Sequence, residues 1–167
     1  MPELIVPRLP VCPSLQEAAR GEDWDQHPAY TDAAALSEVE LADWVGSLIT
    51  DGRPRAPRPA GFVPSTNLWW VDGDRYLGRV QIRHHLTPFL RDVGGHVGYH
   101  VVAAHRRRGH ASAMLAATLP VAAALGLDCV LVTCDADNVG SRRTIEANGG
   151  LFQDQRGAKR RYWVPTA

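Results

Sequence analysis

The sequence has almost no lysine and no excess of either charge. Its 167 residues include 18 basic and 18 acidic side chains, and Lys159 is the only lysine. General nucleic-acid binders are usually basic overall, so a formal net charge of zero argues against that class. A hydrophobic content of 45% argues against a disordered chain. The preference for arginine over lysine is typical of a GC-rich genome.

Cysteines and long apolar runs are also scarce. The three cysteines are Cys12, Cys129 and Cys134, an odd number that predicts neither a disulfide framework nor a zinc site. The longest apolar stretch, residues 114–127, is interrupted by Pro120 and is too short to cross a bilayer. The proline-rich start lacks the basic flank and apolar core of a signal peptide. We therefore expect a soluble cytoplasmic protein without a metal and without a membrane partner.

The charges are distributed unevenly along the chain. Residues 1–51 hold ten of the 18 acidic residues but only two of the basic ones. The remainder of the chain is correspondingly basic. Oppositely charged regions of this kind attract different ligands, so the two parts are expected to face different partners.

Proline and hydrophobic spacing predict how the chain is organised. Most prolines precede residue 65, which predicts loops with limited helix in that part; the best helix there is 32–50, with Thr31 as its N-cap. From residue 65 onward the chain alternates between strands and helices. The predicted elements are strands 67–72, 76–84, 97–102 and 129–134, helices 111–125 and 140–148, and a final strand or hairpin at 152–164. This order predicts one α/β domain with a mixed sheet, spanning residues 1–167.

One segment between a predicted strand and a predicted helix carries the chemistry. It runs Arg106-Arg107-Arg108-Gly109-His110-Ala111. Gly109 lets the backbone turn tightly, and the free amides of the first helical turn form an anion site. The preceding arginines add forked donors for phosphate. The segment is neither a Walker P-loop nor a Rossmann fingerprint, and a basic run at a solvated helix end remains the alternative.

These residues resemble a known family. R-x-x-G-x-A after a strand is similar to the acetyl-CoA-binding motif of the GCN5-related N-acetyltransferases (GNAT). Residues 135–150 resemble the second signature of that family, an asparagine before a helix that ends in a glycine pair. Residues 86–101 also resemble a bacterial branch of predicted acetyltransferases. The resemblance covers residues 68–164, with both motifs in the expected order.

The resemblance implies a fold and a cofactor site. The fold would be α/β (α+β), with a mixed, mostly antiparallel sheet, splayed strands and flanking helices. Residues 65–167 would form the CoA-binding core and residues 1–64 the variable acceptor side. Strand backbone would pair with pantetheine, amides of the turn would hold the pyrophosphate, and the Asn138 region would contact the CoA arm; helix capping is the alternative role of Asn138. The implied cofactor-binding residues are Tyr99, His100, Val101, Arg106, Arg107, Arg108, Gly109, His110, Ala111, Ser112, Asn138 and Ser141.

The sequence departs from the family pattern at one catalytic position. An amine attacks the thioester directly in this family, which calls for a base and often for an acid. The tyrosine that usually serves as the acid falls at Ile145, so Ser141, Cys134 or a water would replace it, and we favour Ser141. His96 and His100 are the candidate bases because they share a strand face by parity and histidine titrates near neutral pH. Packing or surface roles are the alternative for both histidines, and Tyr99 is a second candidate base.

Together these features predict an acetyl-CoA-dependent N-acetyltransferase. The expected acceptor is a primary amine of a small molecule, for example a cationic one such as an antibiotic or a polyamine. An acidic rim made by Glu38, Glu40 and Asp43 would attract such a cation. Two alternatives stay open: a protein lysine or N-terminal acetyltransferase, and an inactive CoA-binding sensor module. We expect no nucleic-acid partner, and homodimer formation is left open.

Overall fold

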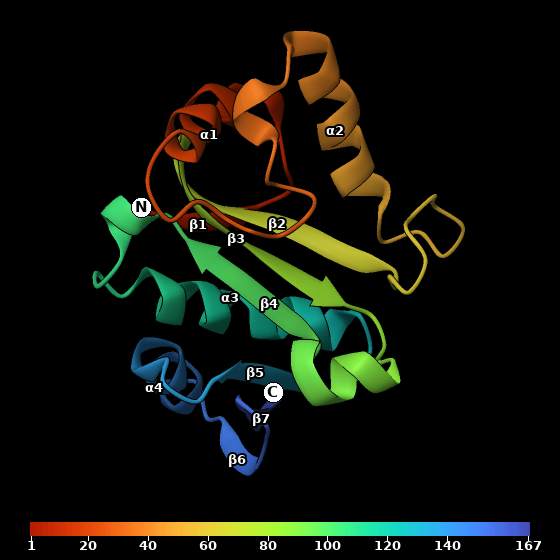
Figure 1. Ribbon diagram of the computed structural model, residues 1–167, viewed down its shortest axis with the longest axis vertical. Helices are drawn as coiled ribbons and strands as arrows, with labels where there is room; N and C mark the ends of the chain where they lie inside the picture. Colours follow the sequence, from red (N-terminus) through yellow and green to blue (C-terminus); the bar gives the residue numbers. More distant parts are fainter.

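A computed structural model describes all 167 residues as one seven-stranded sheet with helices on both faces (Figure 1). The strand order is β1-β2-β3-β4-β5-β7-β6. The strands are β1 (Glu3–Ile5), β2 (Ser65–Asp72), β3 (Arg75–Arg83), β4 (Val97–Val101), β5 (Cys129–Asp135), β6 (Leu151–Arg156) and β7 (Lys159–Pro165). The helices are α1 (Cys12–Ala19), α2 (Glu38–Thr50), α3 (His110–Ala124) and α4 (Val139–Ala147). Shorter helical segments are η1 (Leu9–Val11), η2 (Ala33–Ala35), η3 (Leu90–Gly94) and η4 (Ala103–His105).

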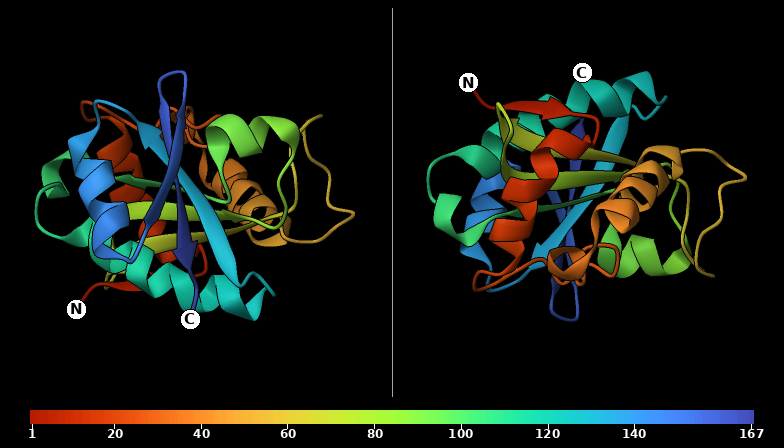
Figure 2. Two further views of the ribbon diagram at one scale, coloured as in Figure 1. Left: turned by 90° about the horizontal axis from the view of Figure 1, so that it is seen from below. Right: turned by 90° about the horizontal axis from the view of Figure 1, so that it is seen from above.

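The sheet is antiparallel except at one place. β4 and β5 run parallel and pair only at Val97 and Val132, whereas every other neighbouring pair of strands is antiparallel. Beyond this junction β5 runs at an angle away from β4 (Figure 2). The expectation of a mixed, mostly antiparallel sheet with splayed strands is therefore confirmed.

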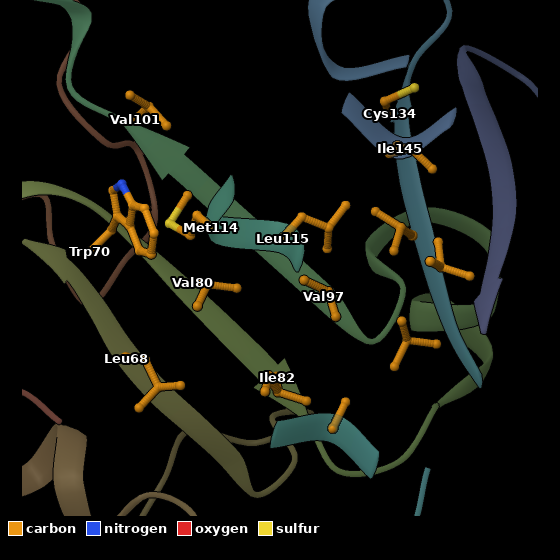
Figure 3. Packing of buried hydrophobic residues seen from close by; sticks show 14 of the residues in the cluster. Leu68, Trp70, Val80, Ile82, Val97, Val101, Met114, Leu115, Cys134 and Ile145 are labelled. Carbon is orange, nitrogen blue, oxygen red and sulfur yellow. The ribbon is translucent and has the colours of Figure 1, made fainter. Parts of the chain in front are cut away.

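Two apolar clusters fasten the helices to opposite faces of the sheet. Trp70 of β2 belongs to the cluster that packs against α3, and its neighbour Trp69 belongs to the cluster beneath α1 and α2. This alternation follows from the two-residue period of a strand. Figure 3 shows Trp70, Val80 and Val97 of three adjacent strands in one cluster with Met114 and Leu115 of α3. The larger cluster thus holds α3 under the strands that flank the splayed junction.

The N-terminal part contains more regular structure than expected. Helix α1 and strand β1 were not predicted, because their short segments lie among prolines. Pro13 is accommodated in the first turn of α1, where a backbone N–H has no intrahelical partner. β1 joins the edge of the sheet by pairing with β2. Prolines at the start of this chain therefore place a helix rather than exclude one.

The predicted start of the second helix is wrong. Residues 33–35 form only the η2 turn, and α2 begins at Glu38 with Ser37 as its N-cap. The Ser37 hydroxyl accepts from the Glu40 N–H, and the Glu40 carboxylate accepts from the Ser37 N–H at 2.8 Å. This capping box satisfies two backbone donors and fixes the helix start, whereas Thr31 bonds to the Pro28 carbonyl instead.

The predicted elements from residue 65 onward are confirmed to within a few residues. Pro120 lies inside α3, which runs through it to Ala124 rather than stopping there. The tail forms the β6–β7 hairpin. No helix has the length and apolar character needed to cross a membrane.

Candidate active site

The divergence of β4 and β5 opens a cleft of about 810 Å³. Its walls come from β4, β5, η3 and the N-terminal ends of α3 and α4. Two segments far apart in sequence, the turn before α3 and the loop before α4, meet there because each follows one of the two splayed strands. The cleft therefore brings both sequence motifs to one place.

The closed end of the cleft is fastened by the residues just before β4. Gly95 has φ +65°, and a Cβ there would lie 2.5 Å from the Leu131 carbonyl oxygen, so the close approach requires glycine. The His96 N–H donates to the Leu131 carbonyl at 2.7 Å, and His96 Nδ1 accepts from the Leu131 N–H at 2.9 Å. His96 thus bridges the two strands where they part.

This position is inconsistent with the expectation that His96 acts as a base. Its side chain is 7% exposed, packs near Trp163, and does not line the cleft. Burial lowers the pKa of His96 to about 4. His100 instead packs against Trp24, so the two histidines do not share an environment despite their matching parity. We therefore interpret His96 as a structural residue.

The turn before α3 has the open backbone expected of an anion site. Gly109 is the N-cap with φ +81°, and no side chain caps the helix. Arg107 also has a positive φ, +62°, a second left-handed residue that the sequence did not reveal. The amides of the first helical turn have no intrahelical partner, and His110, Ala111 and Ser112 all line the cleft. The space around Gly109 is free, since no atom lies within 4 Å of a Cβ built there. These residues fit a pyrophosphate.

The three arginines before this turn have different surroundings. The Arg106 guanidinium is engaged within the protein, because Nε donates to the Val101 carbonyl at 3.0 Å and Nη1 pairs with Asp23 at 3.2 Å. Arg107 lines the cleft and forms no ion pair, whereas Arg108 does not line it. His110 is also engaged, because its Nδ1 accepts from Trp70 Nε1 at 3.2 Å. Only Arg107 of the three can offer its whole guanidinium to a phosphate.

Two hydroxyl groups meet inside the cleft. Tyr99 OH and Ser141 Oγ lie 2.6 Å apart, and both residues line the cavity. The Ser141 N–H donates to Asn138 Oδ1 at 3.0 Å, so Asn138 caps α4 and sets the position of Ser141. Ile145 is fully buried in the core. Tyr99 thus supplies a phenol to the cleft from β4, a pairing that no local sequence signal could reveal.

His100 lines the cleft from the same strand. Its Nδ1 is buried without a hydrogen bond, 3.9 Å from Asp25 Oδ2, and its Nε2 lies 3.3 Å from the Asp23 carbonyl oxygen. Burial lowers the pKa of His100 below its usual value of 6.5. The imidazole is therefore neutral at pH 7, which is the form that can accept a proton.

The expected acidic rim is absent from the cleft. Glu38, Glu40 and Asp43 are exposed on α2 and do not line it. Two other acids of the N-terminal part come close to His100, but Asp23 pairs with Arg106 and Asp25 forms a buried ion pair with Arg79. The only acid that lines the cavity is Asp135, which pairs with Lys159 at 2.6 Å. The cleft therefore presents positive rather than negative charge to a ligand.

Comparisons with known proteins agree with the motifs and the fold. A family described as "Acetyltransferase (GNAT) domain" matches residues 17–150. No match was found among curated proteins. Solved structures with this fold include a putative ribosomal-protein-serine acetyltransferase from Vibrio cholerae, with 14% identity, coverage of 98% of this chain and 93% of that chain, and a TM-score of 0.65.

Two further solved structures have similar scores. The Microcin C7 self immunity acetyltransferase MccE, in complex with acetyl-CoA and AMP, has 13% identity, coverage of 98% and 92%, and a TM-score of 0.67. Mycobacterium smegmatis RimJ, in complex with a CoA disulfide, has 16% identity, coverage of 98% and 81%, and a TM-score of 0.68. No group of three or more His, Cys, Asp or Glu side chains could hold a metal ion.

The family match covers most of the chain, so the class of protein is established. The chain belongs to the GNAT acetyltransferases, as its motifs indicated. It is an N-acetyltransferase, and acetyl-CoA is the acetyl donor of this family.

Proposed function

We propose that this enzyme transfers the acetyl group of acetyl-CoA to a primary amine of a small molecule, by direct attack of the amine on the thioester. One observation carries the proposal: a single cleft has free helix amides at one end and the Tyr99–Ser141 hydroxyl pair within it. The first feature suits a polyanionic donor. The second suits a reaction in which a thiolate must be protonated.

The donor would be held mainly by backbone groups. β4 pairs with β3 along one edge, but its other edge is left open once β5 has diverged. The backbone of Tyr99, His100 and Val101 is thereby available to pair with the pantetheine amides. The amides from Arg107 to Ser112 would hold the pyrophosphate. Acetyl-CoA supplies the activated acetyl group as a thioester.

Three side chains would transfer protons during the reaction. Ser141 would donate a proton to the departing sulfur, and Tyr99 would replace that proton through its hydrogen bond to Ser141. Burial raises the pKa of Tyr99 to about 12, so the phenol stays protonated at neutral pH. His100, neutral at pH 7, would accept the proton of the attacking amine.

A small acceptor is supported by the way the cleft is bounded. The η3 segment contributes Val93 and Gly94 to the cavity wall. It is fastened by an ion pair between Asp92 and Arg156, and by a bond from Arg161 Nη1 to the Arg91 carbonyl at 2.7 Å. The Thr133 hydroxyl also donates to the Val93 carbonyl. A wall held from three sides favours a compact acceptor over a folded protein surface.

Acetylation of a protein N-terminus is the second candidate. It is favoured by similar structures described as a ribosomal-protein-serine acetyltransferase and a ribosomal L7/L12 alpha-N-protein acetyltransferase.

Release of CoA thiol should be measured with a panel of small amines and with peptides bearing free N-termini. We expect turnover with small amines. Turnover with peptides alone would overturn the proposal in favour of protein acetylation, and CoA binding without turnover on any amine would support an inactive module.

A further inference from the structure

The closed end of the cleft contains an arginine that no carboxylate of the protein neutralises. Arg83, the last residue of β3, lines the cavity and is partly buried. Its Nη1 donates to the carbonyls of Gly94 at 2.9 Å and Gly95 at 3.2 Å. Its Nε and Nη2 make no hydrogen bond, and Arg83 takes part in no ion pair. Neither free donor is among the buried unsatisfied atoms, so both remain accessible.

A partly buried guanidinium without an anionic partner costs free energy, unless a ligand supplies that anion. Buried or partly buried charges are usually paired. Burial, followed by the charge of nearby Arg79, lowers the pKa of Arg83 to about 10. The two carbonyl bonds fix one side of the guanidinium and leave the Nε–Nη2 side free. That side carries two donors in the fork geometry that a carboxylate accepts.

The phosphates of the donor cannot supply the missing anion. Their site is the turn that follows the C-terminal end of β4, whereas the Arg83 N–H donates to the His96 carbonyl just before β4 begins. The strand between these points spans roughly 13 Å. Arg83 therefore lies at the end where the acyl group and the acceptor meet, beyond the reach of the pyrophosphate.

The surroundings of Arg83 place it on the acceptor side of the sheet. A Cβ at Gly98 would lie 3.4 Å from Arg83 Nη2, so the guanidinium covers the face of β4 to which Gly98 and His100 contribute. His100 lies opposite Arg79, whose side chain reaches Asp25 in the N-terminal loop. The same face thus carries Arg83 and the candidate base His100.

We infer that Arg83 binds a carboxylate of the acceptor, and that the substrate is an amine with a carboxylate close to its amino group, an amino acid or a close derivative. This inference rests on the proposed function. A carboxylate held on Nε and Nη2 would place the adjacent amine on the face of β4 that also carries His100. It also replaces the expected cationic acceptor, because the cleft holds no unpaired acid to attract one.

The test compares each free amino acid with its own amide. kcat/KM for acetylation is measured for a panel of such pairs with the wild-type enzyme, Arg83→Met, Arg83→Lys and the control Arg143→Met. Arg143 is exposed on α4 and does not line the cleft, so its substitution removes one charge without touching the site. An amide has the less basic amine, so without a carboxylate site it should react at least as well as the acid.

We expect the wild type and Arg143→Met to prefer the acids. Arg83→Met should reduce the acid-to-amide ratio by about tenfold to hundredfold, and Arg83→Lys by less, because lysine keeps the charge but not the fork. The ratio is internal to each variant, so a general loss of stability changes both substrates and leaves it unaltered. Equal reactivity of acids and amides in the wild type, or an equal loss of both in Arg83→Met, would overturn the inference.

Binding provides a second measurement that does not depend on turnover. Calorimetry with CoA present should show that N-acetylated amino acids bind to the wild type and that their amides bind at least tenfold more weakly. If no amine is acetylated, the proposed function fails, yet carboxylate-dependent binding would still support the role of Arg83. Equal binding of the N-acetylated amino acids and of their amides would overturn the role of Arg83.

Discussion

Tyr99 and Ser141 bring two hydroxyl groups together at the scale of single residues, and their roles can be separated by substitution. If Ser141 protonates the leaving sulfur, Ser141→Ala should lower kcat by about 100-fold. Tyr99→Phe should lower kcat by about tenfold, because Ser141 would keep its hydroxyl but lose the donor behind it. The double variant should be no slower than Ser141→Ala, since the two residues act as a unit. Steady-state kinetics with saturating acetyl-CoA would check this, and independent, multiplying effects would contradict the relay.

The surroundings of His100, also a matter of single residues, predict how activity depends on pH. Its lowered pKa keeps the imidazole neutral at pH 7, and the neutral form is lost as the pH falls through a value below 6.5. The kcat of the wild type should therefore decline on the acid side of pH 6.5. His100→Gln should be slower and should lose this decline. His96→Gln is the matched control, because His96 lies outside the cleft lining and should leave the shape of the profile unchanged. A profile unaltered in His100→Gln would exclude the base role.

At the scale of elements, the junction of β4 and β5 decides whether the cleft exists. His96 accepts the Leu131 N–H only while Nδ1 is unprotonated. Its folded pKa of about 4 lies below the usual 6.5, so the unfolded chain binds a proton first. The stabilisation is complete above pH 6.5, is lost as the pH falls from 6.5 to about 4, and changes no further below that. Nearby Arg91 and Arg83 further disfavour its protonation.

Urea unfolding at pH 7 and pH 5 would test this role. We expect the wild type to be less stable at pH 5. His96→Leu should cost about 1–3 kcal/mol at pH 7, because the buried Leu131 N–H loses its acceptor. The variant should also show a smaller difference between the two pH values. His27, whose pKa burial likewise lowers to about 4, should contribute to the remaining difference, as should His84, His100 and His105, whose pKa values burial also lowers. An equal pH dependence of stability in the wild type and in His96→Leu would contradict the role of His96 between β4 and β5.

At the scale of the whole molecule, ion pairs join the acidic N-terminal part of the chain to its basic remainder. Asp25 and Asp23 of the acidic part pair with Arg79 and Arg106 of the basic part. The acids of α2, Glu38, Glu40 and Asp43, are exposed to solvent. These contacts place the N-terminal loop against β4. Arg83 and Arg107, the latter in the turn before α3, are then the arginines of the cleft without an ion pair.

The sequence by itself determined the core of the fold and the two motif segments that line the cleft. The two-residue period of the strands, the glycine turn before α3 and the asparagine before α4 are local signals, because each depends on backbone conformation within a few residues. They were sufficient to predict a mixed sheet and to reveal the resemblance to the family, and that resemblance implied the splayed strands. The start of α2 was misplaced although its capping box, Ser37 with Glu40, is also local and was readable.

Tertiary structure alone decided which side chains meet. The parity of His96 and His100 predicted a shared face, but the glycine turn at Gly95 directs His96 into the β4–β5 junction. Tyr99 contacts Ser141 across 42 positions of sequence, and Arg83 lacks a carboxylate partner whereas Arg79 and Arg106 pair with acids of the N-terminal part. Charge pairing and hydrogen bonding between distant segments depend on distances in space, which a sequence of residue types does not contain.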